Sequence, residues 1–180
     1  GTSIGNQASA TYTDSSNTPR TATSNVAITI VQQVSSFTIT TDGQSKQATA
    51  GAQVFFPHTI SNTGNGTDTF TLSVTNATGD NFDLTSLALY ADANGDGLPD
   101  NNTAITSTGP LAAGATFKFV AVGTVPGSAT AAQSANIVIT AAGTATASPA
   151  AASANTDSVT VTANGVVTVT HSLKIGRAHV

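Results

Sequence analysis

The sequence predicts an all-β protein, a sandwich of about seven or eight antiparallel strands. Charged residues make up only 8% of the 180 residues and Glu is absent, whereas long helices normally rely on Glu, Lys and Arg for their solvent-facing side. Apolar and polar residues instead alternate with a period of two in short segments rich in Thr and Val, which is typical of half-buried strands. Asn, Gly and Ser separate these segments at short intervals, as turns between strands do.

The segment from Gly51 to Thr75 is predicted to be a hairpin at the centre of this fold. Asn62 to Thr67 lie between its two strands, where Asn and Gly supply the positive φ angles of a hairpin turn. The predicted inward-facing residues are Val54, Phe56, His58 and Ile60 in the first strand and Phe70, Leu72 and Val74 in the second.

The same alternation places the other strands of the sandwich. Counting the two strands of the hairpin, at 53–61 and 69–75, we expect strands near 36–41, 53–61, 69–75, 84–91, 104–106, 116–122, 134–141 and 157–163. Four further pairs of side chains are expected to point inward: Leu87 and Leu89, Phe117 and Phe119, Ile137 and Ile139, and Val159 and Val161.

Residues 1–33 are predicted to form a hairpin of their own, with strands at 6–13 and 21–31. Two strands alone are only marginally stable in water, so this hairpin needs a partner. Its order of an Asn, an alternating strand, a polar loop and a second such strand recurs at 134–162. We interpret the match as an internal repeat, and the alternative is that all Thr-rich strands resemble one another.

The repeat predicts three units. Residues 1–33 would be the last hairpin of a preceding repeat, 34–164 one complete repeat, and 165–180 the beginning of a next repeat. The resemblance of the segment that begins at Val34 to the one that begins at Val166 favours this division. The last six residues, 175–180, resemble the translation of a sequencing-adapter read-through and are predicted not to be native.

Five segments together resemble the conserved-repeat, immunoglobulin-like β-sandwich domains of bacterial surface proteins. They are ASATYTD at 8–14, VFFPHTISNTGNGTDTFTLSV at 54–74, LYADANGDGLPD at 89–100, TGPLAAGATFKFVAVGTVP at 108–126 and SVTVTANGVVTVT at 158–170. The resemblance implies an immunoglobulin-like sandwich that occurs in tandem in large exported proteins, as stalks, adhesin arms or envelope filaments. It therefore implies an extracellular or cell-envelope location.

One loop carries a metal-binding pattern. Oxygen-bearing side chains stand at positions 1, 3 and 5, a glycine at position 6 and a further acid at position 9, and the resemblance is to calcium loops of the EF-hand, dockerin and thrombospondin type. The predicted calcium ligands are Asp92, Asn94, Asp96, the carbonyl of Leu98, and Asp100. Thr103 stands at position 12 in place of the usual bidentate Glu, which lowers the expected affinity. The alternative is a bare Asx and glycine turn whose side chains bind their own backbone.

No other residues form a pattern that predicts chemistry. His58 has no partner at a metal-binding spacing and is expected to be a core or sheet-edge histidine bonded to the backbone. Lys118 alternates with Phe117 and Phe119 and is expected to face solvent, which disfavours a covalent cross-link through it. No nucleophile motif is present, so no enzyme is predicted.

Charge and hydropathy exclude two classes of partner. The net charge is −4 and the five Lys and Arg residues are scattered, so nucleic-acid binding is not expected. No apolar run is long enough to span a bilayer, and the absence of Cys excludes disulfides. The predicted partners are neighbouring repeats of the same chain or copies of itself.

The function expected from these observations is mechanical. The first hypothesis is a calcium-stiffened stalk module of an exported bacterial surface protein. The second is a subunit of an extracellular filament that assembles by β-strand addition, since the first hairpin lacks a partner. The third is a carbohydrate- or protein-binding adhesin module, for which Tyr12 and Tyr90 are the available aromatic platforms.

Overall fold

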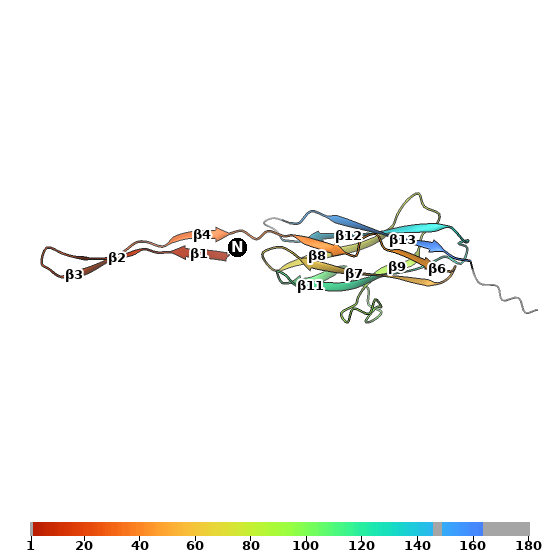
Figure 1. Ribbon diagram of the computed structural model, residues 1–180, viewed down its shortest axis with the longest axis horizontal. Coiled ribbons are helices and arrows are strands. Elements are labelled where there is room, and N and C mark those ends of the chain that lie inside the picture. The colour runs from red at the N-terminus through yellow and green to blue at the C-terminus, as the bar shows by residue number, and fades with distance from the viewer. Residues whose placement is uncertain (1, 146–148, 164–180) are drawn as a thin grey trace, which may run out of the picture.

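The protein is all-β, as predicted, and its centre is an immunoglobulin-like sandwich of two antiparallel-rich sheets (Figure 1). A computed structural model describes residues 2–145 and 149–163. One sheet has the order β5-β7-β11-β9 and the other β10-β8-β12-β13-β6. Their strands are β5 (Phe37–Thr40), β6 (Ser45–Ala48), β7 (Gln53–Asn62), β8 (Asp68–Asn76), β9 (Thr85–Ala91), β10 (Ser107–Leu111), β11 (Thr116–Thr124), β12 (Ser134–Gly143) and β13 (Ser153–Val161).

The period-two pattern fills the space between the sheets. Along β7 every second residue from Val54 to Ile60 is buried, because alternate side chains of a strand point to opposite faces. Phe56, Phe70 and Phe119 are wholly enclosed, and aliphatic side chains from both sheets surround them. Most predicted inward residues are confirmed as buried; Val74, Leu87 and Phe117 lie half-buried at the margin of the core.

The prediction that residues 51–75 form a hairpin is wrong. β7 pairs with β5 and β11, whereas β8 pairs with β10 and β12, so the turn between them crosses from one sheet to the other. The alternation predicts which face of each strand is buried, but a strand can bury that face equally well in either sheet. The Asn62 side chain donates to Gly66 O (2.9 Å) and to Leu111 O (2.8 Å), which folds the turn over the end of the sandwich.

Three strands differ from prediction. β6 was not expected, because its sequence SKQA shows no apolar alternation; it is aligned by parallel pairing with β13. The strand expected at 104–106 lies instead at 107–111, while Ala104 makes one isolated bridge to Tyr90. β13 also begins at Ser153, four residues before its predicted start.

The N-terminal residues form the predicted hairpin, which extends from one end of the sandwich as a long arm (Figure 1). β1 (Thr2–Asn6) pairs with β4 (Ala27–Val31), and β2 (Ser9–Thr13) pairs with β3 (Pro19–Thr23). Asp14 closes the tip, where its carboxylate accepts from Thr18 N (3.0 Å) and Arg20 Nε (2.9 Å). These contacts hold the pKa of Asp14 below its ordinary 3.8.

Every strand residue of the arm is exposed, including Ile4, Ile28 and Ile30, and so is Val26, which directly precedes β4. The described residues hold no helix that is both long and apolar enough to cross a membrane. The predicted unit boundary at 164/165, the next repeat at 165–180 and the non-native tail at 175–180 lie outside the described residues.

Candidate functional site

The predicted calcium ligands lie together in the loop that follows β9. Asp92 comes directly after the strand and is only 2% exposed. Its Oδ1 accepts from Gly95 N (2.9 Å) and Asp96 N (3.1 Å), and its Oδ2 accepts from Gly97 N (3.1 Å). Gly95 and Gly97 have φ angles of 75° and 82°, which an L side chain adopts only with strain. One buried carboxylate therefore organises the loop by capping three amides.

The other predicted ligands continue this pattern. Asn94 Oδ1 accepts from Asp96 N (3.0 Å), and Asp96 Oδ1 accepts from Leu98 N (2.9 Å). Asp100 Oδ2 accepts from Ala93 N (2.7 Å), which joins the two ends of the loop. The side chains thus make successive Asx turns. This is the arrangement that the sequence analysis gave as the alternative to a calcium site.

Two further observations bear on a cation at this loop. Asn94 Nδ2 donates to Asp96 Oδ2 (3.0 Å), so these two side chains bind each other directly. No group of three or more His, Cys, Asp or Glu side chains is arranged to hold a metal within residues 2–145 and 149–163. Asn oxygens and backbone carbonyls remain available as hard ligands. Calcium binding therefore stays a prediction.

Lys118 is exposed, as predicted, but it does not extend freely into solvent. A Cβ added to Gly95 would collide with the Lys118 Nζ, so the side chain lies across the aspartate loop. A pocket of about 200 Å³ lies there and includes Asp92, Gly95 and Lys118. The ammonium lies against Gly95 of the loop, a position that sequence alternation alone could not locate.

His58 is buried, but its partner is not the backbone as expected. Its Nε2 lies 2.9 Å from Asp157 Oδ2, and both side chains are 0% exposed. The separation is that of an ion pair, although its angle leaves Asp157 Oδ2 without a hydrogen bond from the described residues. His58 is on β7 and Asp157 is on β13, so the pair connects the two sheets. Asp157 could have been found from its alternation with Val159 and Val161.

The enclosed position of this pair decides what chemistry it can do. Asp157 Oδ1 also accepts from Gln44 N (2.8 Å), and Gln44 Nε2 donates to Pro57 O (2.9 Å). A general base must reach the proton that it removes from a substrate. Because His58 and Asp157 have no exposed side-chain surface, their arrangement supports a structural connection between the sheets and not a reaction.

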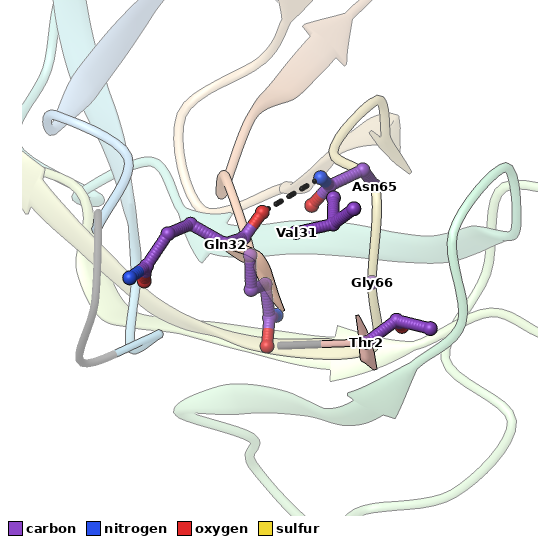
Figure 2. A pocket seen from close by; sticks show the side chains of 6 residues that line it. Thr2, Val31, Gln32, Asn65 and Gly66 are labelled. Carbon is purple, nitrogen blue, oxygen red and sulfur yellow. Dashed lines mark hydrogen bonds between the residues drawn. The ribbon is translucent and has the colours of Figure 1, made fainter. Parts of the chain in front are cut away.

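The junction between arm and sandwich contains a site that the sequence did not reveal. A pocket of about 230 Å³ lies at this place, and Figure 2 shows the residues that line it. Its lining comes from the arm, from the linker (residues 32–36) that joins the arm to the sandwich, and from the β7–β8 turn: Thr2, Val31, Gln32, Gln33, Asn65 and Gly66. The turn residues were assigned to a hairpin, so their contact with the linker was missed.

Asp68 fixes the last part of the linker to the sandwich. Its Oδ2 accepts from the buried Ser35 hydroxyl, and its Oδ1 accepts from Thr69 N (2.7 Å) and Thr144 N (3.2 Å). Burial acts to raise the pKa of Asp68, but the hydrogen bonds from Ser35, Thr69 and Thr144 outweigh it and hold the pKa below 3.8. The ionised carboxylate is therefore the form that the folded junction favours.

Comparison with known proteins gives likenesses of fold only. No protein-family model matches the chain, and no curated protein sequence matches it significantly. Among solved structures, PapD-like domain 7 of human CEP192 covers 71% of this chain and 87% of its own, at 13% identity and a TM-score of 0.42.

Two other structures are similar to a comparable extent. A family 123 glycoside hydrolase from Clostridium perfringens matches 67% of this chain and 23% of its own, at 13% identity and a TM-score of 0.44. AggA, the major subunit of aggregative adherence fimbriae type I from Escherichia coli, matches 74% and 98%, at 12% identity and a TM-score of 0.35. At these identities and TM-scores, no function passes from any of them to this chain.

Proposed function

We propose that the chain is a structural module of an exported bacterial surface protein, in which successive sandwiches extend along one axis. The observation that carries the proposal is the arm: a hairpin with no buried strand residue, continuous with the sandwich through a fixed linker (Figure 1). A two-stranded ribbon with exposed Ile28 and Ile30 needs the rest of a sandwich to cover it. A preceding unit that lacks its last hairpin would supply that cover.

The edges of the sandwich favour a preceding unit of the same chain as the partner of the arm, and they disfavour strand addition by another copy. β5 and β6 are each four residues long, and Lys46 on β6 shares the inward row with the buried Val159. β10 carries Pro110 and an irregular register, and the outer edge of β9 is occupied where Ile105 N donates to Leu89 O (2.8 Å). Short strands, inward charges, prolines and bulges all discourage edge-to-edge pairing. Each edge is thus a poor template for an added strand.

A filament subunit is the second candidate function, and the same arm favours it. If the exposed face of the arm is covered by another copy, association depends on the apolar side chains of β4, chiefly Ile28 and Ile30. The stalk proposal expects the purified chain to remain monomeric, since no copy carries a sandwich that lacks a hairpin.

Electron microscopy and analytical ultracentrifugation of the purified chain separate the two functions. Elongated monomers support the stalk, whereas ordered fibres that disappear in I28K/I30K support the filament. The matched control is T21K/T23K, which adds the same charge to exposed strand positions of the arm without removing apolar surface. Fibres in all three proteins would contradict a role for the apolar face.

Calcium stiffening of the loop that contains Asp92, Asp96 and Asp100 is part of the proposed function. A cation that binds only the folded loop would add its binding free energy to the stability of the module. The support for it is the ordered placement of the predicted oxygen ligands in one curled loop with glycines at the sharp turns.

A further inference from the structure

We infer that the turn from Asn62 to Asp68 is a binding seat for the linker, and that it locks the direction in which the arm leaves the sandwich. The turn is free to do so because β7 and β8 belong to different sheets and share no ladder. Its amides therefore donate to the linker: Thr63 N and Gly64 N both donate to Ser36 O, at 2.9 and 3.1 Å.

Asn65 is the centre of this seat. Its Oδ1 accepts from Val34 N (2.7 Å), its Nδ2 donates to Gln32 O (3.0 Å), and its backbone N donates to Val34 O (3.2 Å). Figure 2 shows the Asn65 side chain directed at Gln32 across the pocket. One residue thus binds an extended backbone as a neighbouring strand would, with a side-chain amide in place of a second peptide group.

Two glycines allow the linker to lie directly on the turn. A Cβ on Gly64 would stand 2.5 Å from Val34 O and 3.1 Å from Ser36 N. A Cβ on Gly66 would stand 3.0 Å from Gln33 Cδ. Because real Cβ atoms do not approach backbone oxygen at 2.5 Å, any larger residue at position 64 must displace the linker. Gly64 is needed for this close approach, which explains it better than a hairpin turn does.

Side chains of the linker complete the contact. Gln33 Nε2 donates to Thr67 O (2.7 Å), and Ser36 Oγ accepts from Thr63 Oγ1 (2.8 Å). With the buried bond from Ser35 to Asp68, the five linker residues 32–36 are held at every position. The ligand that this seat accepts is an extended peptide read mainly through its main chain. Whatever precedes the linker then keeps a fixed angle to the sandwich.

Nuclear magnetic resonance of the full chain tests the seat residue by residue. We expect the backbone of 32–36 to be as rigid on the nanosecond timescale as that of β7, and the Val34 amide to be protected from hydrogen exchange. In N65A, which removes two of the three bonds from Asn65, the Val34 amide should exchange about five to ten times faster. Residues 32–36 should become mobile while the melting temperature stays within a few degrees.

A conservative variant and a control sharpen the test. N65D keeps the acceptor for Val34 N and loses the donor to Gln32 O, so it should restore protection of Val34 but leave Gln32 mobile. N102A removes an exposed Asn for which the described residues offer no side-chain hydrogen bond, and it should change neither. A flexible linker in the wild-type chain, or N65A without effect on Val34, would overturn the inference. Neither result bears on whether units follow in tandem, so the stalk proposal is tested separately.

Discussion

The buried contact of His58 with Asp157 shows how much a single polar pair can matter in this fold. Both side chains are fully enclosed between sheets whose buried side chains are mostly aliphatic or aromatic. Taking two ionisable groups out of water is costly, and leaving one of them unpaired costs more than removing both. The pair therefore fixes the relative position of β7 and β13 more strictly than apolar packing would.

We predict that D157A lowers the free energy of unfolding by about 3–5 kcal/mol, because it leaves His58 buried without its partner. Urea unfolding of D157A, H58A and the double variant measures this. The double variant should lose less than the sum of the single losses, because the two groups are in direct contact. Strict additivity of the two losses would show that the contact contributes nothing.

Asp68 predicts an acid-sensitive junction. Its pKa is held below 3.8 in the folded protein, so its contribution to stability is fully present above pH 3.8 and is lost as the pH falls through the lowered value. We expect D68N to be less stable than the wild type at pH 7, and the difference between them to shrink below about pH 4.

Chemical unfolding across pH 2.5–7 checks this difference. The matched control is D83N, an exposed carboxylate to which the described residues donate no side-chain hydrogen bond. D83N should parallel the wild type at every pH. A constant gap between D68N and the wild type over the whole range would show that ionisation of Asp68 does not stabilise the fold.

At the scale of elements, the aspartate loop carries a separate prediction. Millimolar calcium should raise the melting temperature of the wild type and release or absorb heat in calorimetric titration, because the ion binds the folded loop. D96A should abolish both effects with little loss of stability without calcium, since the Asp96 side chain accepts only two exposed hydrogen bonds, from Leu98 N and Asn94 Nδ2.

D92A is the informative companion to D96A. Asp92 caps three amides, so its loss should destabilise the protein even without calcium. D83A serves as the control and should keep any calcium response. If the wild type shows neither heat nor a melting shift at millimolar calcium, the loop is a set of Asx turns alone.

The strands were more predictable than their partners. Alternation located β7, β8, β11 and β12 within about two residues and identified the core-facing side of β7, β8 and β12, whereas β11 is buried at consecutive residues from Phe119 to Gly123. It could not give the sheet to which a strand belongs, because β7 and β8 present the same pattern on opposite sides of the core. That choice depends on contacts distant in sequence, such as the bond from Asn62 Nδ2 to Leu111 O.

The candidate sites differ in the same respect, namely whether their contacts are local or distant in sequence. The aspartate loop is local in sequence, so its residues were found, and the side chain to backbone bonds of its Asx turns were among the alternatives. The linker seat joins positions about 31 residues apart, from Val34 to Asn65, and no local pattern indicates it. The available signal was the pair Gly64 and Gly66, which a hairpin turn explains equally well from sequence alone.

At the scale of the whole molecule, the structure is a long body with a narrow extension (Figure 1). The sandwich supplies its own core, whereas the arm buries none of its strand residues. This contrast predicts two unfolding events: amides of the arm should exchange with solvent at low free energy, and amides of β7, β11 and β12 only on global unfolding. Hydrogen exchange followed by mass spectrometry measures the two classes, and uniform protection would contradict the contrast.

The edge strands of the sandwich, which discourage pairing with other strands, have a consequence for crowding. Proteins displayed on a cell surface are close to one another. Exposed strand edges would then pair between neighbouring molecules and cause aggregation. Here a neighbouring strand cannot readily pair with the edges of the sandwich, because of Pro110, the inward Lys46 and the covered outer side of β9. Under the proposed function, modules packed side by side on a cell surface would therefore remain separate, provided that each arm is covered by its own chain.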